Sequence, residues 1–220
     1  MSLNLNKNQS LNNISENMVD ELLDLEIILI DNFDSFTYNL VNQLRPMVRG
    51  LKVFRNNTNL NLLIRAELSN ATKKIIVISP GPGDPTSAGI TLNLIKQFKG
   101  AIPILGICLG HQAIIQSYKG KIGAAKNIFH GKASDIELEK DEQEIFASLT
   151  SPFRAARYHS LAAKNIPNDL KVIAKCGDEV MAIKHIKHKV LGFQFHPESI
   201  LTPKGKQLME NSLRWLSKAS

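Results

Sequence analysis

The sequence predicts an α/β fold with a central, largely parallel mixed sheet, helices on both faces, and a smaller antiparallel sheet. Three observations predict it. In the first half of the chain, short apolar runs alternate with helical patterns, which is typical of strand–helix–strand units. After Lys121 the segments become shorter and alternate apolar with polar residues, which favours antiparallel strands and hairpins. The length of 220 residues fits a single domain of this class.

The expected elements follow from these patterns in order. Strands are expected over the apolar runs Glu26–Asp31, Lys52–Arg55, Lys74–Ser79 and Ala101–Leu105. Helices are expected over Ser35–Leu44, which stops before Pro46, over Thr86–Phe98, and from Cys108 to near Gly120. Antiparallel strands are expected over Asp135–Leu138, Phe153–Tyr158, Lys171–Lys175, Val180–His185 and Val190–Phe195. The amphipathic stretch Lys204–Trp215 is expected to close the chain as a helix.

Residues 1–24 differ from the rest of the chain because they are rich in Asn and Ser and weakly periodic. This composition predicts an N-terminal extension, flexible or forming a short helix, ahead of a domain over residues 25–220. Deleting the extension is expected to leave the fold intact. The alternative is that Val19, Leu22, Leu23 and Leu25 form one apolar helix face that docks on the domain or on a partner.

Composition narrows the class of protein. The net charge is +7, but the lysines are scattered and aromatic residues make up only 6%, which argues against a nucleic-acid partner. No apolar run is long enough to span a membrane, and no secretion signal is evident. We therefore expect a cytoplasmic protein in which Cys108 and Cys176 are reduced thiols. No His or Cys pair has metal-ligand spacing and no nucleotide-binding loop is present, so neither a metal nor a cofactor is expected.

The segment Gly106–His111 is the first chemical motif. It joins an apolar strand to a helical pattern, with a glycine two residues before and two after Cys108. This is the layout of a sharp turn that presents a nucleophile at its tip. The N-terminus of the following helix favours the thiolate form of a cysteine. A buried structural cysteine is the alternative for Cys108 taken alone.

Two further motifs supply what a thiolate nucleophile needs. His196 and Glu198 follow an apolar strand two residues apart, so in extended chain they point to one side as a base and its orienting carboxylate. The turn Ser79–Pro85 should lie beside Cys108, because parallel strands end at the same sheet edge. We expect the backbone amides of Gly83 and Leu109 to form an oxyanion hole there. Taken alone, each motif also fits an ordinary strand end or turn.

Together these motifs resemble the signatures of class I, or triad, glutamine amidotransferases, and the resemblance covers roughly residues 26–217. It implies that Cys108 attacks the side-chain amide of L-glutamine, that His196 transfers the proton, and that Glu198 holds His196. Water then hydrolyses the thioester to glutamate. The positions that the resemblance assigns to glutamine binding are Gly81, Pro82, Gly83, Leu109, Gln112, Ser160 and Leu161. His111, next to the turn, is not catalytic in this family.

Finer motifs resemble one branch of the family. The segments Asp31–Asn39, His130–Lys132, Arg157–Leu161 and Gln194–Ile200 resemble the glutaminase subunit, component II, of anthranilate synthase. They equally resemble that of its sister, aminodeoxychorismate synthase, and one subunit can serve both. The implied partner is a chorismate-utilising synthase subunit, component I, which receives the ammonia. The segments Asp34–Tyr38 and Pro82–Thr86 are the candidate docking surface.

Two other functions remain open at this point. A free-standing γ-glutamyl thiol hydrolase would use the same scaffold without a synthase partner. A non-catalytic subunit that only regulates a synthase would be expected to have a damaged triad, whereas Cys108, His196 and Glu198 are all present.

Overall fold

The computed structural model describes residues 22–69, 72–139 and 144–218. The helices are α2 (Thr37–Leu44), α3 (Leu60–Leu63), α4 (Thr91–Phe98), α5 (Leu109–Ser117) and α6 (Gly205–Ser217), with short helical turns η1 (Arg45–Met47), η2 (Ile64–Leu68) and η3 (Pro85–Ser87). The strands of the first half are β1 (Glu26–Asp31), β2 (Gly50–Arg55), β3 (Lys74–Ile78), β4 (Ile104–Ile107) and β5 (Lys121–Ala124). Those of the second half are β6 (Lys132–Leu138), β7 (Phe153–Arg157), β8 (Leu161–Asn165), β9 (Leu170–Cys176), β10 (Glu179–His185) and β11 (Val190–Phe193).

The strands form one large mixed sheet and one small antiparallel sheet. Within the described residues, the large sheet has nine strands in the order β2-β1-β3-β4-β11-β10-β9-β6-β7, and β5 pairs with β8 in the small sheet. The pairs from β2 to β11 are parallel, and those from β11 to β7 are antiparallel. The carboxyl ends of β1, β3 and β4 therefore meet at one edge, where motifs that are far apart in the sequence come together.

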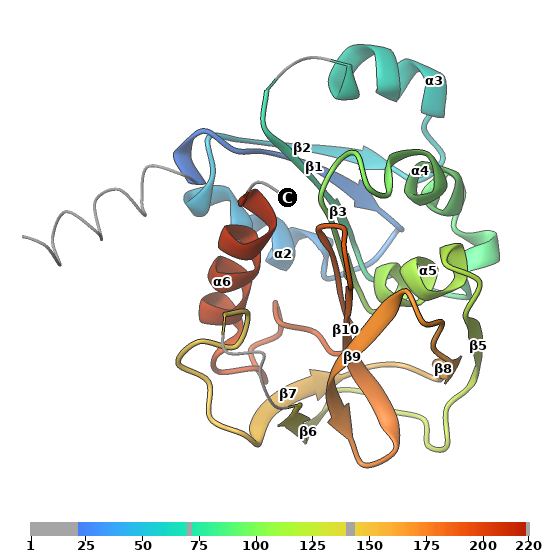
Figure 1. Ribbon diagram of the computed structural model, residues 1–220, viewed down its shortest axis with the longest axis vertical. Helices are drawn as coiled ribbons and strands as arrows, with labels where there is room; N and C mark the ends of the chain where they lie inside the picture. The colour runs from blue at the N-terminus through green and yellow to red at the C-terminus, as the bar shows by residue number, and fades with distance from the viewer. Residues whose placement is uncertain (1–21, 70–71, 140–143, 219–220) are drawn as a thin grey trace, which may run out of the picture.

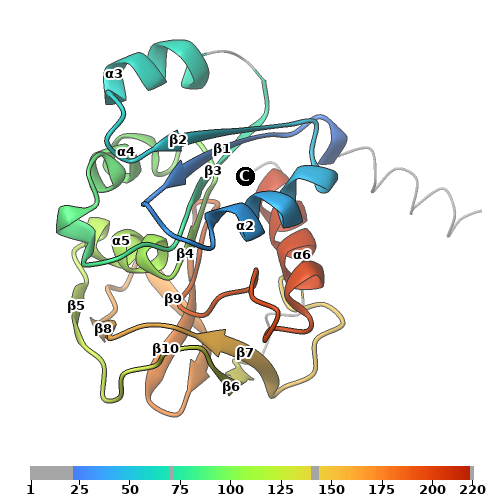
Figure 2. The same ribbon diagram turned by 180° about the vertical axis from the view of Figure 1, so that it is seen from behind.

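Helices cover both faces of the parallel part of the sheet, as predicted. Figures 1 and 2 show α2 and α6 on one side of it and α4 and α5 on the other. Strand periodicity accounts for both layers, because successive side chains point to opposite faces. Ile27 and Leu29 pack with the α2 and α6 side, whereas Ile28 and Ile30 pack with the α4 and α5 side. Burial of apolar surface on both sides drives this sandwich.

The structure changes several element boundaries. Thr86–Phe98 is not one helix, because the backbone of Gly89 has a positive φ of 53° and separates η3 from α4. The elements α3, η2, β5 and β8 were not expected from the sequence. Most antiparallel strands of the second half extend the large sheet, and only β5 and β8 form the small one. No helix in the described ranges is long and apolar enough to cross a membrane.

Only residues 22–24 of the predicted extension lie within the described part of the chain. Residues 1–21 are outside the described residues, so a short helix in the extension stays a prediction. Leu22 is 4% exposed and packs in the core with Leu25, whereas Leu23 is 48% exposed. The core therefore includes one side chain of the segment assigned to the extension.

We expect Leu22→Ala to destabilise the protein and Leu23→Ala to leave its stability almost unchanged. Truncating a buried leucine costs about 2–5 kcal/mol of unfolding free energy, which lowers the melting temperature by roughly 4–20 °C in a domain of this size. Thermal unfolding of both variants checks this. Equal melting temperatures for the two variants would show that Leu22 does not contribute to the core.

Candidate active site

Cys108 lies at the tip of a strained turn between β4 and α5. Its backbone has φ 50° and ψ −100°, a conformation that non-glycine residues rarely adopt and that is often found at functional sites. The amide of Cys108 donates to the carbonyl of Phe193 (2.7 Å), and its own carbonyl accepts from the amide of Gln112 (3.1 Å). The strained turn is thus held on both sides, with Cys108, a residue that is 7% exposed, at the N-terminus of α5.

The flanking glycines allow this turn to pack tightly. A Cβ atom on Gly110 would lie 2.5 Å from the carbonyl oxygen of Ile78 in β3, which no side chain tolerates without a backbone shift. A Cβ on Gly106 would collide with the backbone of Gly110. The sequence pattern of two glycines around Cys108 therefore reflects close approach of backbone to backbone.

His196 and Glu198 form the expected pair, although not by the expected route. The strand β11 ends at Phe193, so alternation along a strand does not place the two side chains. Instead His196 sits on an isolated bridge, where its amide donates to the carbonyl of Ala156 (2.9 Å). The Nδ1 of His196 donates to Oε1 of Glu198 at 2.7 Å, and both side chains are almost fully buried.

This pairing leaves the other ring nitrogen of His196 available. Nε2 makes no hydrogen bond within the described part of the chain. Burial opposes the charged ring, but the charge of Cys108 and, after it, the Glu198 carboxylate outweigh burial and hold the pKa of His196 well above its usual value. The arrangement is that of an imidazole close to the sulfur of Cys108 and oriented by a carboxylate, as proton transfer to and from a thiol requires.

The glycine-rich turn after β3 is clamped by Asn32, at the end of β1. The amide of Asn32 donates to the hydroxyl of Ser79 (2.9 Å), and its side-chain amide donates to the carbonyl of Ser79 (3.0 Å). The side-chain oxygen of Asn32 accepts from Asn56 and Thr91. A Cβ on Gly81 would lie 2.5 Å from the Cβ of Asn32, so the turn can pack this closely only with glycine there. Asn32 thus holds the turn against the sheet edge.

Most of the predicted site residues line one small hollow. Its volume is about 120 Å³, and it is lined by Gly81, Pro82, Gly83, Cys108, Gln112, Tyr158, His159, Ser160 and Leu161. The predicted Leu109, His196 and Glu198 are not among these lining residues. Gly83 has a positive φ of 77°, which a glycine adopts without strain. The hollow therefore joins the cysteine turn and the glycine-rich turn to the segment Tyr158–Leu161, and Tyr158 packs against His196 of the third motif.

The segment Tyr158–Leu161 is supported by buried polar contacts. The Nε of Arg157 donates to Nε2 of His159 (3.1 Å), so Nδ1 of His159 carries the proton that it donates to the carbonyl of Leu161 (3.0 Å). Burial and, after it, the Arg157 charge lower the pKa of His159 to about 4, which keeps the ring neutral. Arg157 also pairs with Glu179 and stacks on Phe129. These contacts fix the loop that faces Cys108.

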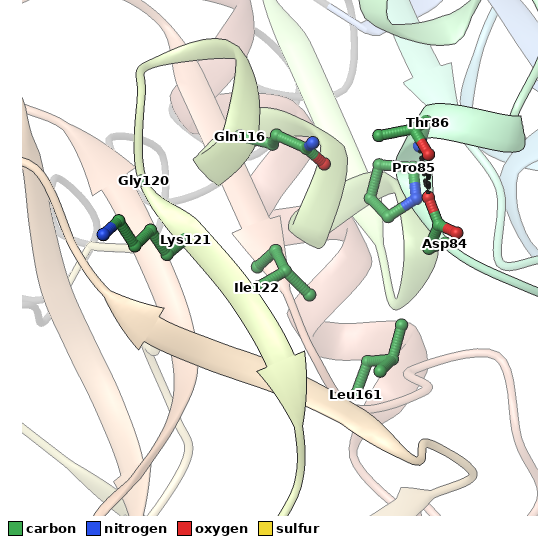
Figure 3. A pocket seen from close by; sticks show the side chains of 8 residues that line it. All are labelled: Asp84, Pro85, Thr86, Gln116, Gly120, Lys121, Ile122 and Leu161. Carbon is green, nitrogen blue, oxygen red and sulfur yellow. Dashed lines mark hydrogen bonds between the residues drawn. The ribbon is translucent and has the colours of Figure 1, made fainter.

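A larger hollow of about 500 Å³ lies next to this site, farther along α5 from Cys108 (Figure 3). The two hollows share Leu161, and Gln112 and Gln116 line them one helical turn apart. Figure 3 shows the side chains of Gln116 and Ile122 within the hollow and the amino end of Lys121 leading away from it. Its lining residues include no cysteine and no histidine, whereas Cys108 lines the smaller hollow, so the chemistry selects the smaller hollow as the active site.

Three residues near the reacting groups were quoted only as parts of motifs and were given no role. Gln194 contacts the sulfur of Cys108, and the ring of Tyr158 packs edge-on against that of His196 with centroids 4.9 Å apart. Asn32 holds the glycine-rich turn. Nothing in a single sequence distinguishes them, because their contacts join segments that are far apart. His111 is fully buried, and burial lowers its pKa to about 3, which suits a neutral packing residue.

Residues 28–215 match the protein-family model described as glutamine amidotransferase class-I. Anthranilate synthase component 2 of Haemophilus influenzae is 45% identical over 190 residues, which are 86% of this chain and 97% of that protein. Anthranilate synthase component 2 of Buchnera aphidicola subsp. Schizaphis graminum is 48% identical over 191 residues, which are 87% of this chain and 96% of that protein.

Solved structures share the fold. The crystal structure of a glutamine amidotransferase from Thermotoga maritima matches with a TM-score of 0.67 and covers 89% of this chain and 99% of its own. Its sequence identity is 14%, so this likeness speaks for the fold alone.

Proposed function

The chain belongs to the class I glutamine amidotransferase family, and we propose that within this family it is the glutaminase subunit of an anthranilate synthase. The observation that carries the proposal is the strained Cys108 in a small hollow, close to the buried pair of His196 and Glu198. The names of relatives at 45% and 48% identity support the choice of anthranilate synthase.

The geometry suits hydrolysis of a primary amide through a thioester. The sulfur of Cys108 attacks the side-chain amide carbon of glutamine, and the amides of Gly83 and Leu109 stabilise the oxyanion. His196 donates its proton to the leaving nitrogen, which departs as ammonia, and a γ-glutamyl thioester remains. Water then attacks the thioester with His196 as base, releasing glutamate and the thiol. Glu198 holds the ring of His196 through both steps.

The contacts of Gln112 fix what it offers the substrate. Its Nε2 donates to the carbonyl of Leu161 and to Oε1 of Gln194, both at 3.1 Å, so both of its N–H groups are used. Gln112 lines the hollow, and its remaining side-chain polar atom, Oε1, can only accept a hydrogen bond. We therefore assign Gln112, one of the expected glutamine-binding positions, to the α-ammonium group of glutamine.

An apolar surface patch beside the triad is our candidate for binding the synthase subunit. We call it the entrance patch, and it combines two exposed apolar segments on either side of Tyr158: Phe33, Phe36 and Tyr38 after β1, and Ile200 and Leu201 after Glu198. It connects to the active site through Tyr158, whose ring contacts Phe36 and His196 and whose hydroxyl lies 3.4 Å from that of Ser199. Clustered exposed apolar side chains typically mark protein–protein interfaces. A partner bound here would cover the triad side of the hollow.

We expect Ile200→Asp to weaken binding of the synthase subunit by about tenfold or more, because Ile200 is 95% exposed and a buried charge opposes docking. Glutaminase activity of the isolated chain should be low, should rise with the synthase, and should rise less in this variant. The matched control is Leu62→Asp on the distant α3, where the exposed leucine is outside the patch. Equal affinities for the two variants, or full activity without a partner, would contradict this assignment.

Product analysis tests the proposed function. The chain is combined with chorismate, glutamine and either an anthranilate synthase component I or an aminodeoxychorismate synthase component I. We expect glutamine-dependent anthranilate with the first. Glutamine-dependent product with the second alone would assign the chain to the sister pathway, and glutamate release that neither subunit affects would favour a free-standing hydrolase.

A further inference from the structure

Gln194 is buried beside the nucleophile, one residue beyond the end of β11. Its side chain is 0% exposed, and its backbone amide donates to the carbonyl of Met181 (2.8 Å). The side-chain Nε2 donates toward the sulfur of Cys108 at 3.7 Å, and the side-chain Oε1 accepts from Gln112 at 3.1 Å. The triad of Cys108, His196 and Glu198 does not account for this buried amide, which joins the nucleophile to the proposed substrate-binding residue Gln112.

The orientation of this amide is fixed by the hydrogen-bond network. The carbonyl of Leu161 can only accept, so the group of Gln112 that faces it must be the NH₂. The second hydrogen of that NH₂ points to Gln194, which must therefore present its oxygen to Gln112. The NH₂ of Gln194 is then left facing Cys108. One backbone carbonyl, that of Leu161, thus determines that a donor rather than an acceptor faces the sulfur.

We propose that Gln194 is a further catalytic residue, whose side-chain N–H donates to the sulfur of Cys108 and stabilises its negative charge before attack and again when the thioester breaks. This inference rests on the proposed function and adds a residue to its mechanism. A thiolate at a 7% exposed position has little contact with water and needs donors from the protein. The helix N-terminus and His196 supply charge stabilisation, and Gln194 supplies a directed hydrogen bond.

The test measures the reactivity of Cys108 without substrate. The rate of alkylation of Cys108 by iodoacetamide is followed between about pH 5 and 9, with peptide mass spectrometry to separate Cys108 from Cys176. We expect Gln194→Met to slow alkylation at pH 7 by about tenfold, since a hydrogen bond to a charged group contributes roughly that factor or more. The pH of half-maximal alkylation should move upward.

Two variants keep the test specific. Gln194→Glu has the same shape but presents an acceptor to the sulfur, so it should slow alkylation more than Gln194→Met does. Asn211→Leu on α6 is the control, because Asn211 is also a buried amide that lies away from the site. Its NH₂ donates to the carbonyls of Ile145 and Ala147, and its oxygen accepts from Gln207. This control variant should lower thermal stability and leave the alkylation profile unchanged. Both Gln194 variants keep the other titratable groups around the sulfur, namely His196, Glu198, Tyr158 and His159.

An alkylation profile of folded Gln194→Met and Gln194→Glu that matches the unaltered protein would overturn the proposal. This outcome is separate from failure of the proposed function, because alkylation requires neither glutamine nor a synthase. If the protein had no glutaminase activity but its alkylation profile still depended on Gln194, the hydrogen bond to Cys108 would be supported and the proposed function would be wrong.

Discussion

Cys108→Ala is expected to abolish glutamine-dependent anthranilate synthesis by the complex, while synthesis from added ammonia continues. The thioester forms only on the sulfur of Cys108, so its removal should cost at least about ten-thousand-fold in kcat for glutamine. The synthase subunit uses ammonia at its own site and should be unaffected. Parallel assays with glutamine and with an ammonium salt, at saturating synthase, measure both activities.

The conservative control for this variant is Cys176→Ala. Cys176 is the second free thiol, and its sulfur accepts a hydrogen bond from Arg157 at 3.4 Å, outside the residues that line the hollow around Cys108. It should retain most of the glutamine-dependent activity. Glutamine-dependent synthesis that survives in Cys108→Ala would remove Cys108 as the nucleophile.

His196→Ala is expected to lose nearly as much activity as Cys108→Ala. Glu198→Gln should keep a kcat roughly ten to a hundred times higher than that of His196→Ala. The imidazole moves the proton, whereas the carboxylate only orients and stabilises the ring. Glu198 is among the groups that raise the pKa of His196. Its neutral replacement should therefore lower that pKa and shift the alkaline fall of kcat to lower pH.

Steady-state kinetics over a range of pH separates these effects. Thermal unfolding must accompany it, because Glu198 is buried against His196 and both variants alter a packed pair. If Glu198→Gln proved as inactive as His196→Ala at every pH, Glu198 would have to take part in proton transfer itself.

Local patterns in the sequence were sufficient to predict strands β1 to β4 of the parallel half of the fold, whereas β11, expected among the antiparallel strands, also pairs in parallel with β4. The strand Glu26–Asp31 is observed with the predicted bounds, since four consecutive buried apolar residues leave little ambiguity. The two-faced sheet with a small antiparallel partner is confirmed. Short elements were missed, because α3 is a single turn and β5 is barely half-buried, so neither carries a strong periodic pattern.

The candidate site could be assembled from motifs, but the contacts between motifs could not be predicted. Cys108 and the pair His196–Glu198 are adjacent in the fold because β4 and β11 pair in parallel, which one sequence does not specify. The pair of His196 and Glu198 was expected from alternation along a strand. That reason was wrong, because the strand β11 already ends at Phe193. The contact of Gln194 with Cys108 depends on the same pairing, so it was not expected.

The most direct measurement of the central claim follows the nitrogen itself. The complex is supplied with chorismate and with glutamine that carries a heavy-nitrogen label on its side-chain amide, in the presence of a small amount of unlabelled ammonia. The account predicts anthranilate whose amino nitrogen is heavy in the unaltered complex and light in the complex that contains Cys108→Ala. Equal labelling of anthranilate in the two complexes, or labelled ammonia without labelled anthranilate, would contradict the claim that this chain supplies the synthase through Cys108.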